Sequence, residues 1–198
     1  MIIGLTGGSG TGKSTAVETI VNFGFIPIDF DRISRDVSAP GTKCLSEIVF
    51  VFGNDILTEN KALNRRKLGE IVFADKSKLE ILTGITHKYI LEETNNIIAS
   101  NKNENLLFDA PLLFEAGLEK KCDFVISILA DRQKRIERIC ARDLISPESA
   151  KNRINSQPDD EFYISKSDYC VYNNSTQKDF KMQIAQIIRS KLNEASSK

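Results

Sequence analysis

Consecutive residues near the start of the chain, Gly7 to Thr15 (GGSGTGKST), have the residue types and spacing of a phosphate-binding loop: glycine, any four residues, glycine, lysine, then serine or threonine. The glycines allow backbone conformations closed to other residues, so that consecutive N–H groups turn inward toward a polyphosphate. Lys13 adds a full charge that reaches the β- and γ-phosphates, and the Ser14 hydroxyl binds Mg²⁺. The alternative, a glycine-rich turn that caps a helix, needs neither the lysine nor four glycines. We therefore interpret the stretch as a binding site for the phosphates of a nucleotide.

Carboxylates follow two predicted strands. Asp29 and Asp31 come at the end of the short apolar run 25–28, and Asp109 ends a second such run (NLLFD). Ligands bind at the carboxyl ends of parallel strands. An apolar run that ends in Asp is typical of a carboxylate that holds Mg²⁺, although it is also an ordinary strand exit. Asp29 and Asp31 lie on the same side if the strand persists, whereas Asp31 equally suits the cap of a helix expected from 32 to 37.

A stripe of arginines is predicted on the helix 131–143. Arg135, Arg138 and Arg142 are three and four residues apart, which places them on one face. Such a stripe is usually a solvated face, but beside a phosphate loop it also suits an enzyme that transfers phosphoryl groups. A second short basic helix, 146–157, begins with a serine cap and a proline, and the helix pair predicts a mobile lid.

Short apolar runs alternate with helical segments along the chain, which predicts a parallel sheet covered by helices on both faces. The strands are expected at residues 2–6, 25–28, 105–109, 123–129 and 169–172. Between the second and third lies a helical block, roughly 42 to 100, that is too long for a simple crossover and suggests a substrate-binding subdomain. Within it, helices are expected at 42–52, 62–73, 77–83 and 86–99. The basic trio 65–67 opposes the dipole of its helix, which favours a ligand role slightly, although a solvated turn is the commoner explanation.

The composition is that of an ordinary globular protein of one α/β domain. Among its 198 residues, Lys plus Arg and Asp plus Glu each number 27, and a net charge of zero argues against nonspecific nucleic-acid binding. The four cysteines are scattered, which favours unpaired thiols in a reducing cytoplasm. No apolar segment marks the chain for a membrane or for secretion. The single histidine, His87, has no motif around it that supports Ser-His-Asp chemistry.

In their order and spacing, these motifs resemble the dephospho-coenzyme A kinase family over nearly the whole chain. The resemblance rests on the phosphate loop and on these stretches: Ile28–Asp31 (IDFD, where the family usually has Asp-Ala-Asp), Arg35 with Pro40-Gly41, 63–69 (LNRRKLG) before Val72-Phe73, 85–87 (ITH), 109–118 (DAPLLFEAGL), Arg138 to Asp143, and Arg153-Ile154 with Gln157. Two positions depart from the family pattern. Lys88 stands where the family has proline, and Asn173-Asn174-Ser175 replaces a late Asn-x-Gly in the loop expected near adenine.

The resemblance implies the three-layer fold of phosphate-loop nucleoside triphosphatases, with sheet order 2-3-1-4-5. It implies a single kinase domain whose core comprises 1–41, 104–139 and 168–198, with a helical coenzyme-A-binding region at 42–103 and a lid at about 140–160. The implied reaction transfers the γ-phosphate of ATP to the ribose 3′-hydroxyl of dephospho-coenzyme A, with Mg²⁺ as cofactor. The products would be coenzyme A and ADP, in the last step of coenzyme A biosynthesis. The implied partners are ATP and dephospho-coenzyme A alone, without nucleic acid or membrane, and the implied enzyme is a cytoplasmic monomer with weak self-association left open.

The resemblance also assigns roles to single residues. Asp31 is expected to orient the hydroxyl and accept its proton, Lys13 to hold the β/γ oxygens, and Arg138 to stabilise charge or, like Arg142, to stack on adenine. The residues expected to bind ATP are Gly8, Gly10, Thr11, Gly12, Lys13, Ser14, Thr15, Arg142 and Asn173. The residues expected to bind the acceptor are Asp31, Arg65, His87, Asp109 and Leu112, and those expected to bind the metal are Ser14 and Asp109.

Two other functions fit part of the pattern. A nucleoside monophosphate kinase shares the fold and the phosphate loop, and the stretch 109–118 is what favours the first family over it. A GTP-driven switch is suggested by Asn101 to Glu104 (NKNE), which resembles a guanine-reading motif. That stretch precedes the third strand instead of following a late one, and 109–112 lacks the glycine of a switch.

Overall fold

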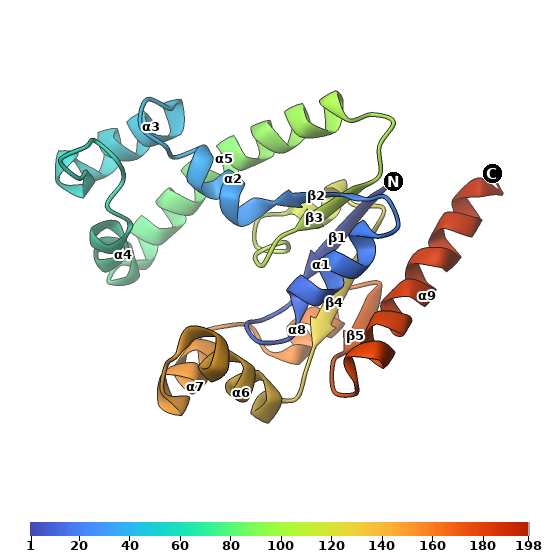
Figure 1. The fold of residues 1–198 in the computed structure, drawn as a ribbon. Helices are drawn as coiled ribbons and strands as arrows, with labels where there is room; N and C mark the ends of the chain where they lie inside the picture. The colour runs from blue at the N-terminus through green and yellow to red at the C-terminus, as the bar shows by residue number, and fades with distance from the viewer. Residues whose placement is uncertain (198) are drawn as a thin grey trace. The chain divides into compact units, whose positions relative to one another are not determined.

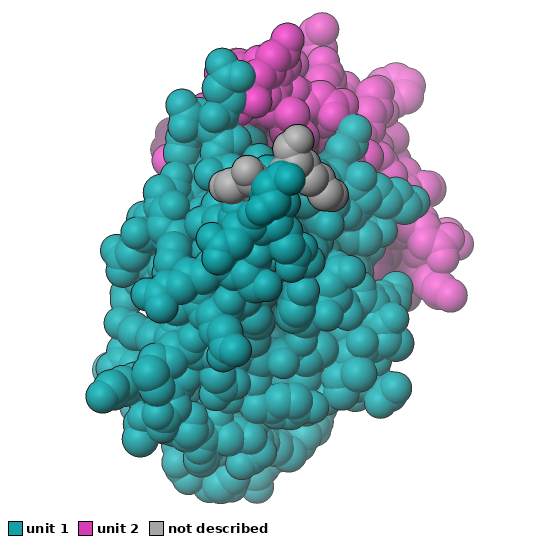
Figure 2. Space-filling view, turned by 90° about the vertical axis from the view of Figure 1, so that its right-hand side faces the viewer, with its two compact units in different colours: residues 1–29, 103–198 teal, residues 30–102 magenta. Residues whose placement is uncertain are grey.

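The computed structural model describes residues 1–197, so Lys198, the last residue of the predicted core, lies outside the described part. The chain divides into two compact units (Figure 2). Unit 1 comprises residues 1–29 and the chain from Asn103 onward, and unit 2 comprises Phe30–Lys102. The predicted ATP-binding residues all belong to unit 1, and most of the predicted acceptor residues belong to unit 2.

Unit 1 is built on one parallel sheet with the strand order β2-β3-β1-β4-β5. The strands are β1 (Ile2–Thr6), β2 (Ile26–Asp29), β3 (Leu106–Asp109), β4 (Phe124–Leu129) and β5 (Tyr169–Tyr172). Every residue of β4 is buried, as expected for a strand that helices cover on both faces. The predicted order 2-3-1-4-5 and the fold class are confirmed, and β1, which leads into the phosphate loop, lies at the centre of the sheet.

The helical elements of unit 1 follow the strands along the chain, and α1 and α9 pack against the apolar side chains of the sheet. The helical elements are α1 (Lys13–Val21), the 3₁₀ turn η2 (Leu118–Lys121), α6 (Arg132–Asp143), α7 (Pro147–Asn155), α8 (Asp160–Ile164) and α9 (Gln177–Ser196). Figure 1 shows α1 and α9 along the same face, where Ile20 and Phe180 join Leu5 and Ile126 in the main core. A separate small core, with Ile139 fully buried, joins α6 to α7. The sequence did not predict α8 or η2, which are about one turn long.

Unit 2 is built of helices, with an isolated antiparallel bridge between Leu57 and Leu63. Its elements are α2 (Phe30–Asp36), α3 (Lys43–Phe52), the 3₁₀ turn η1 (Asn54–Ile56), α4 (Arg65–Phe73) and α5 (Lys76–Ser100). Side-chain caps define the starts of α3 and α4: Thr42 accepts from Leu45 N at 3.2 Å and Asn64 accepts from Lys67 N at 3.0 Å. The prediction of two helices at 77–83 and 86–99 was wrong, because α5 is one continuous helix of 25 residues. A helix-interior glycine costs about 1 kcal/mol, and packing of the residues around Gly84 into the core of unit 2 outweighs that cost.

The two candidate carboxylates after β2 are separated by a change of secondary structure. β2 ends at Asp29, which pairs in register with Asp109 of β3. Helix α2 begins at the next residue, so Asp31 lies in the first turn of a helix, where the helix dipole stabilises a negative charge. The strand therefore does not persist to Asp31, and the alternation that would put both carboxylates on one side of the sheet does not apply.

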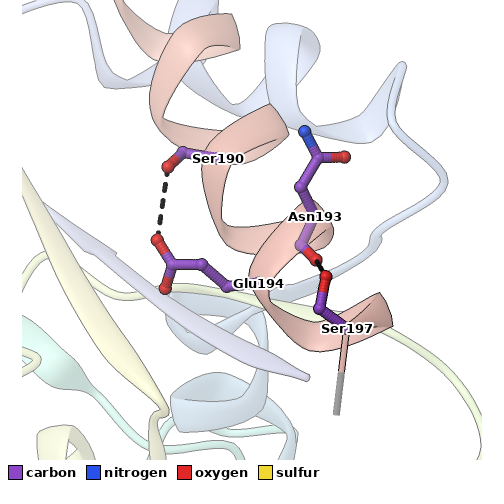
Figure 3. Close-up of a pocket in the computed structure, with 4 residues that line it drawn as sticks. All are labelled: Ser190, Asn193, Glu194 and Ser197. Atoms are coloured by element: carbon purple, nitrogen blue, oxygen red, sulfur yellow. Dashed lines mark hydrogen bonds between the residues drawn. The ribbon is translucent and has the colours of Figure 1, made fainter.

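A shallow hollow lies along the C-terminal turns of α9 (Figure 3). It is lined by Ser190, Asn193, Glu194 and Ser197. Ser190 Oγ donates to Glu194 Oε1 at 3.3 Å, and Ser197 Oγ donates to the Asn193 carbonyl at 2.9 Å. The hydroxyls bond within their own helix, and no residue of the predicted site lines this hollow.

Candidate active site

The phosphate loop connects β1 to α1, and its glycines are required by close packing as well as by backbone conformation. Gly12 has a φ of +102°, in the region that other residues avoid. A Cβ added at Gly12 would collide with the amide of Asn173, and one added at Gly8 would collide with the guanidinium of Arg135. The loop is therefore pressed against side chains from two later segments of unit 1, which leave no room for larger residues.

Two side chains hold the carbonyl groups of the loop from outside. Arg138 Nη1 donates to the Gly10 carbonyl at 3.2 Å, and Asn173 Nδ2 donates to the Thr11 carbonyl at 2.8 Å. Arg138 Nη2 also donates to the Asn173 carbonyl at 2.9 Å, which ties the two anchors together. These carbonyls bond outward, which leaves the inner side of the loop to its N–H groups. Some of those N–H groups already have partners: Ser9 N–H donates to Gln157 Oε1 at 2.9 Å and Thr11 N–H to the Gly8 carbonyl at 3.4 Å. Asn173 is buried, with 9% of its surface exposed.

Lys13 and Asp109 meet beside the loop. The Lys13 ammonium forms an ion pair with the Asp109 carboxylate, and 19% and 23% of the two side chains are exposed. The pair brings together the predicted phosphate-binding lysine, at the start of α1, and the predicted metal-binding carboxylate, at the end of β3. Ser14 lies in the first turn of α1 and is exposed. A hydroxyl and a carboxylate are oxygen ligands of the kind that Mg²⁺ prefers, so the residues present fit that ion.

A second arginine, which the sequence placed only in the stripe, is buried against the loop. Arg135 has 5% of its surface exposed, and its Nε donates to the Ser9 carbonyl at 3.0 Å. Its Nη1 lies 3.9 Å from the Asp160 carboxylate. Burial lowers the pKa of the guanidinium, the neighbouring Asp160 carboxylate opposes that shift, and arginine remains charged in proteins.

Gln157 completes this contact from the segment after α7. Its Oε1 accepts from Ser9 N at 2.9 Å and from Arg135 Nη2 at 3.0 Å, and its Nε2 donates to Ser9 Oγ at 3.1 Å. Sequence reasoning included Arg135 in a stripe that suits phosphoryl transfer and Gln157 in the family pattern, but it gave neither residue a site role of its own. The helical spacing of Arg135 from Arg138 was the sequence feature that could have indicated its role. For Gln157 that feature was its place in the family pattern.

The third arginine of the stripe does not reach the loop. Arg142 donates from Nε and Nη2 to the Asp143 carboxylate at 2.7 and 3.0 Å, and Arg153 of α7 binds the same carboxylate. These bonds lower the pKa of Asp143 to about 2, with the Arg142 bond the largest cause. The predicted stripe is thus divided between the loop, which holds Arg135 and Arg138, and a surface ion-pair cluster that holds Arg142.

Three predicted acceptor residues belong to unit 2. Asp31 is exposed in the first turn of α2, and His87 is half-buried on α5. Arg65, at the start of α4, donates from Nη2 to Ser38 Oγ at 2.8 Å and to the Ser34 carbonyl at 3.4 Å. The structure therefore brings Arg65 against the helix that carries Asp31, which the sequence spacing did not reveal.

A cavity of about 190 Å³ lies beside Arg65 within unit 2. Half of its lining residues are aliphatic, from α3, α4, α5 and Leu63, and Phe73 adds an aromatic ring. The polar lining residues are Ser34, Ser38, Arg65 and Thr86. Phe73 is 81% exposed, which is unusual for a large aromatic side chain. Of the other predicted acceptor residues, Asp109 and Leu112 belong to unit 1, where Leu112 is 61% exposed in the turn after β3.

A parallel sheet of this order, with a glycine-rich loop whose carbonyls bond outward and a lysine paired with the carboxylate of a neighbouring strand, is the architecture of a phosphate-loop kinase. The sequence model of the dephospho-CoA kinase family matches residues 1–179. The chain therefore belongs to the dephospho-CoA kinase family.

Individual proteins agree with this assignment. A dephospho-CoA kinase of Fusobacterium nucleatum subsp. nucleatum is 40% identical over 179 residues, which cover 90% of this chain and 92% of that one. The structure of dephospho-CoA kinase from Campylobacter jejuni is 30% identical, with a TM-score of 0.68 and coverage of 95% of each chain. TT1252 from Thermus thermophilus, at 23% identity, a TM-score of 0.81 and coverage of 96% and 97%, shows the same fold.

Membership of this family makes the chain a kinase that transfers phosphate to an alcohol group, in the last step of coenzyme A biosynthesis. Phosphoryl transfer in phosphate-loop kinases depends on ATP and generally uses a divalent metal. Within residues 1–197, no helix combines the length and the hydropathy that a membrane span requires.

Proposed function

We propose that this enzyme transfers the γ-phosphate of ATP to the ribose 3′-hydroxyl of dephospho-coenzyme A, which gives coenzyme A and ADP. The observation that carries the proposal is the phosphate loop, with its carbonyls bonded outward to Arg138 and Asn173 and with the Lys13–Asp109 pair beside it. Membership of the dephospho-CoA kinase family supports the choice of acceptor.

The donor half of the mechanism belongs to unit 1. The phosphates of ATP bind at the loop residues Gly8, Gly10, Thr11, Gly12, Lys13, Ser14 and Thr15. Lys13 leaves its pairing with Asp109 to hold the β/γ oxygens. Ser14 and Asp109 hold Mg²⁺, which when bound supplies positive charge to those oxygens. Arg138 remains a candidate for charge stabilisation and Arg142 for adenine stacking. In this structure Arg138 bonds to loop carbonyls, a geometry that favours positioning of the loop.

The acceptor half of the proposal rests mostly on unit 2, with Asp109 and Leu112 added from unit 1. Asp31 orients the 3′-hydroxyl and accepts its proton. Phosphoryl transfer passes through a loose transition state, so the orientation of the alcohol contributes more than the basicity of the carboxylate. Arg65, His87, Asp109 and Leu112 contact the acceptor. The partly aliphatic cavity beside Arg65 suits an acceptor that joins an anionic diphosphate to an uncharged arm.

The proposal treats the region 42–103 as the acceptor-binding part and residues 140–160 as a lid that excludes water, because water would otherwise take the phosphoryl group. The enzyme acts as a cytoplasmic monomer on small molecules, without nucleic acid or membrane. The four free cysteines and the zero net charge support the location and the absence of a nucleic-acid partner.

A direct test supplies ATP and Mg²⁺ with one acceptor at a time and measures ADP release. The acceptors are dephospho-coenzyme A, each nucleoside monophosphate, and no acceptor. We expect rapid release only with dephospho-coenzyme A. Preference for a nucleoside monophosphate would overturn the choice of acceptor, and selective GTP binding without transfer to any acceptor would favour a switch.

A further inference from the structure

Ser9 is held through both its backbone and its side chain, which is more than the function described so far requires. Its carbonyl accepts from Arg135 Nε at 3.0 Å, its N–H donates to Gln157 Oε1 at 2.9 Å, and its hydroxyl accepts from Gln157 Nε2 at 3.1 Å. All the polar groups of one phosphate-loop residue therefore bond to two side chains that are far away in sequence.

The two side chains also fix each other. Arg135 Nη2 donates to the same Gln157 oxygen at 3.0 Å, and with 5% of its surface exposed Arg135 has little freedom to move. A Cβ at Gly8 would collide with Arg135 and come within 3.0 Å of Gln157 Oε1, so the loop fits closely against the pair. Ser9 and Gln157 are half-buried around the buried Arg135, and such a network favours one geometry, because another arrangement would leave the buried guanidinium with fewer partners.

Gln157 and Arg135 belong to different segments of unit 1. Arg135 lies on α6, whereas Gln157 follows α7, which packs on α6 through the buried Ile154 and Ile139. Ser9 is therefore bonded to the segment between α7 and α8, within the region proposed as the lid. A displacement of that segment would release the N–H and the hydroxyl of Ser9 and loosen the loop.

We propose that Gln157 is a positioning residue for the phosphate donor: through Ser9 it holds the phosphate loop in its anion-binding shape and couples the segment after α7 to the donor site. This inference rests on the proposed function in taking the loop as the ATP site. It assigns Gln157 no contact with the reacting atoms, and its effect passes through the backbone of Ser9.

The test uses the full chain and three variants. Gln157→Met keeps the side-chain volume and removes the three hydrogen bonds. Ser9→Ala removes only the hydroxyl. Asn155→Ala is the matched control, because Asn155 ends α7 and bonds to Arg132, away from the loop. The readouts are the exchange rate of the Ser9 amide without nucleotide, the Kd of a non-hydrolysable ATP analogue with Mg²⁺, and the Tm.

For Gln157→Met we expect Ser9 amide exchange to be at least about tenfold faster, because its acceptor is removed. We expect the Kd for the analogue to be about tenfold weaker, because part of the effect of the three lost hydrogen bonds appears in binding and the rest in stability. Ser9→Ala should weaken the Kd about threefold, and Asn155→Ala should match the wild type. The Tm of Gln157→Met should fall by several degrees while the protein stays folded, because the lost bonds also stabilise the fold. Ser9 exchange and Kd within twofold of wild type in Gln157→Met would overturn the proposal. The exchange readout needs no acceptor, so it succeeds or fails separately from the assignment of dephospho-coenzyme A.

Discussion

The candidate donor residues of unit 1 and the candidate acceptor residues of unit 2 are held in different ways. In unit 1, buried side chains such as Arg135 and Asn173 bond to the backbone of one contiguous loop. In unit 2, Asp31 and Arg65 are exposed on the first turns of separate helices. A site made of backbone groups is fixed by the fold, whereas a site made of exposed side chains changes with single substitutions. The comparison indicates that donor binding is the constrained part of this enzyme and that acceptor choice is the adjustable part.

The largest effect is expected from Lys13→Ala. Loss of the only full positive charge of the loop should lower kcat/KM by about 10³-fold or more, because charge on the transferred phosphoryl group is no longer stabilised. The fold should persist, since the Lys13–Asp109 pair is partly exposed. Steady-state kinetics and circular dichroism check both points, with Lys120→Ala, an exposed change on η2, as the control. Near-normal kinetics would remove the donor assignment.

Asp31→Asn tests the acceptor side at its proposed base. We expect kcat to fall about 10²-fold, which is the lower range for loss of a general base, while the KM for ATP changes little. Asp29→Asn is the matched control, because Asp29 ends β2 two residues earlier and has no proposed role in the reaction. An equal fall of kcat in the two variants would contradict the assignment of Asp31 as the base.

A pair of glycine substitutions compares a packed and an open position within unit 1. Gly12 and Gly24 both have positive φ, but a Cβ at Gly12 would collide with Asn173, while nothing lies within 4 Å of one at Gly24. We expect Gly12→Ala to lower the free energy of unfolding by about 2 kcal/mol or more and Gly24→Ala by about 1 kcal/mol, from strain alone. Urea denaturation measures both. Equal losses would mean that Asn173 yields and that the loop is less constrained than described.

Arg65→Ala should act on the acceptor alone. Removing an exposed cation from the start of α4 should raise the KM for dephospho-coenzyme A about tenfold and leave the KM for ATP unchanged, because the donor residues belong to unit 1. Initial-rate kinetics with each substrate varied separately check the split. An equal rise in both KM values would contradict the division of labour between the units. Lys67→Ala, on the same turn, is the control.

The smallest effect concerns the ion-pair cluster at the end of α6. Arg142 and Arg153 lower the pKa of Asp143 from its ordinary 3.8 to about 2, so the folded state favours the carboxylate. The stabilisation from these pairs is therefore complete above about pH 3.8 and is lost as the pH falls from there through about 2. A carboxyl NMR titration should give a midpoint near the lower value, and Arg153→Ala should move it upward. A midpoint at the ordinary value in the wild type would mean that the cluster does not persist in solution.

The sequence predicted the parts of the fold that depend on local patterns. The phosphate loop is one contiguous motif, and β1 and β5 are short apolar runs, so their bounds follow from neighbouring residues. The continuity of α5 through Gly84 did not follow, because tertiary packing outweighs a local propensity of about 1 kcal/mol. The strand order came from the family resemblance and not from periodicity.

The support around the candidate site was less predictable. The bond between Ser9 and Gln157 joins residues 148 positions apart, and no local pattern specifies such a contact. Helical spacing placed Arg135, Arg138 and Arg142 on one face, but it does not determine which guanidinium is buried against the loop. The burial of each guanidinium depends on tertiary contacts of α6 with later segments. One of these segments is α7, which packs on α6 and whose Arg153 and Asn155 bond to Asp143 and Arg132 of that helix.

The central claim is that the loop of unit 1 presents the phosphate of ATP to one alcohol group of dephospho-coenzyme A. The most direct test incubates the enzyme with γ-labelled ATP, Mg²⁺ and dephospho-coenzyme A and locates the label in the product by phosphorus NMR and mass spectrometry. We predict that the label appears on the ribose 3′-oxygen with the wild type and is absent with Lys13→Ala. Label at another oxygen, in free phosphate alone, or on the 3′-oxygen at an undiminished rate with Lys13→Ala would contradict it.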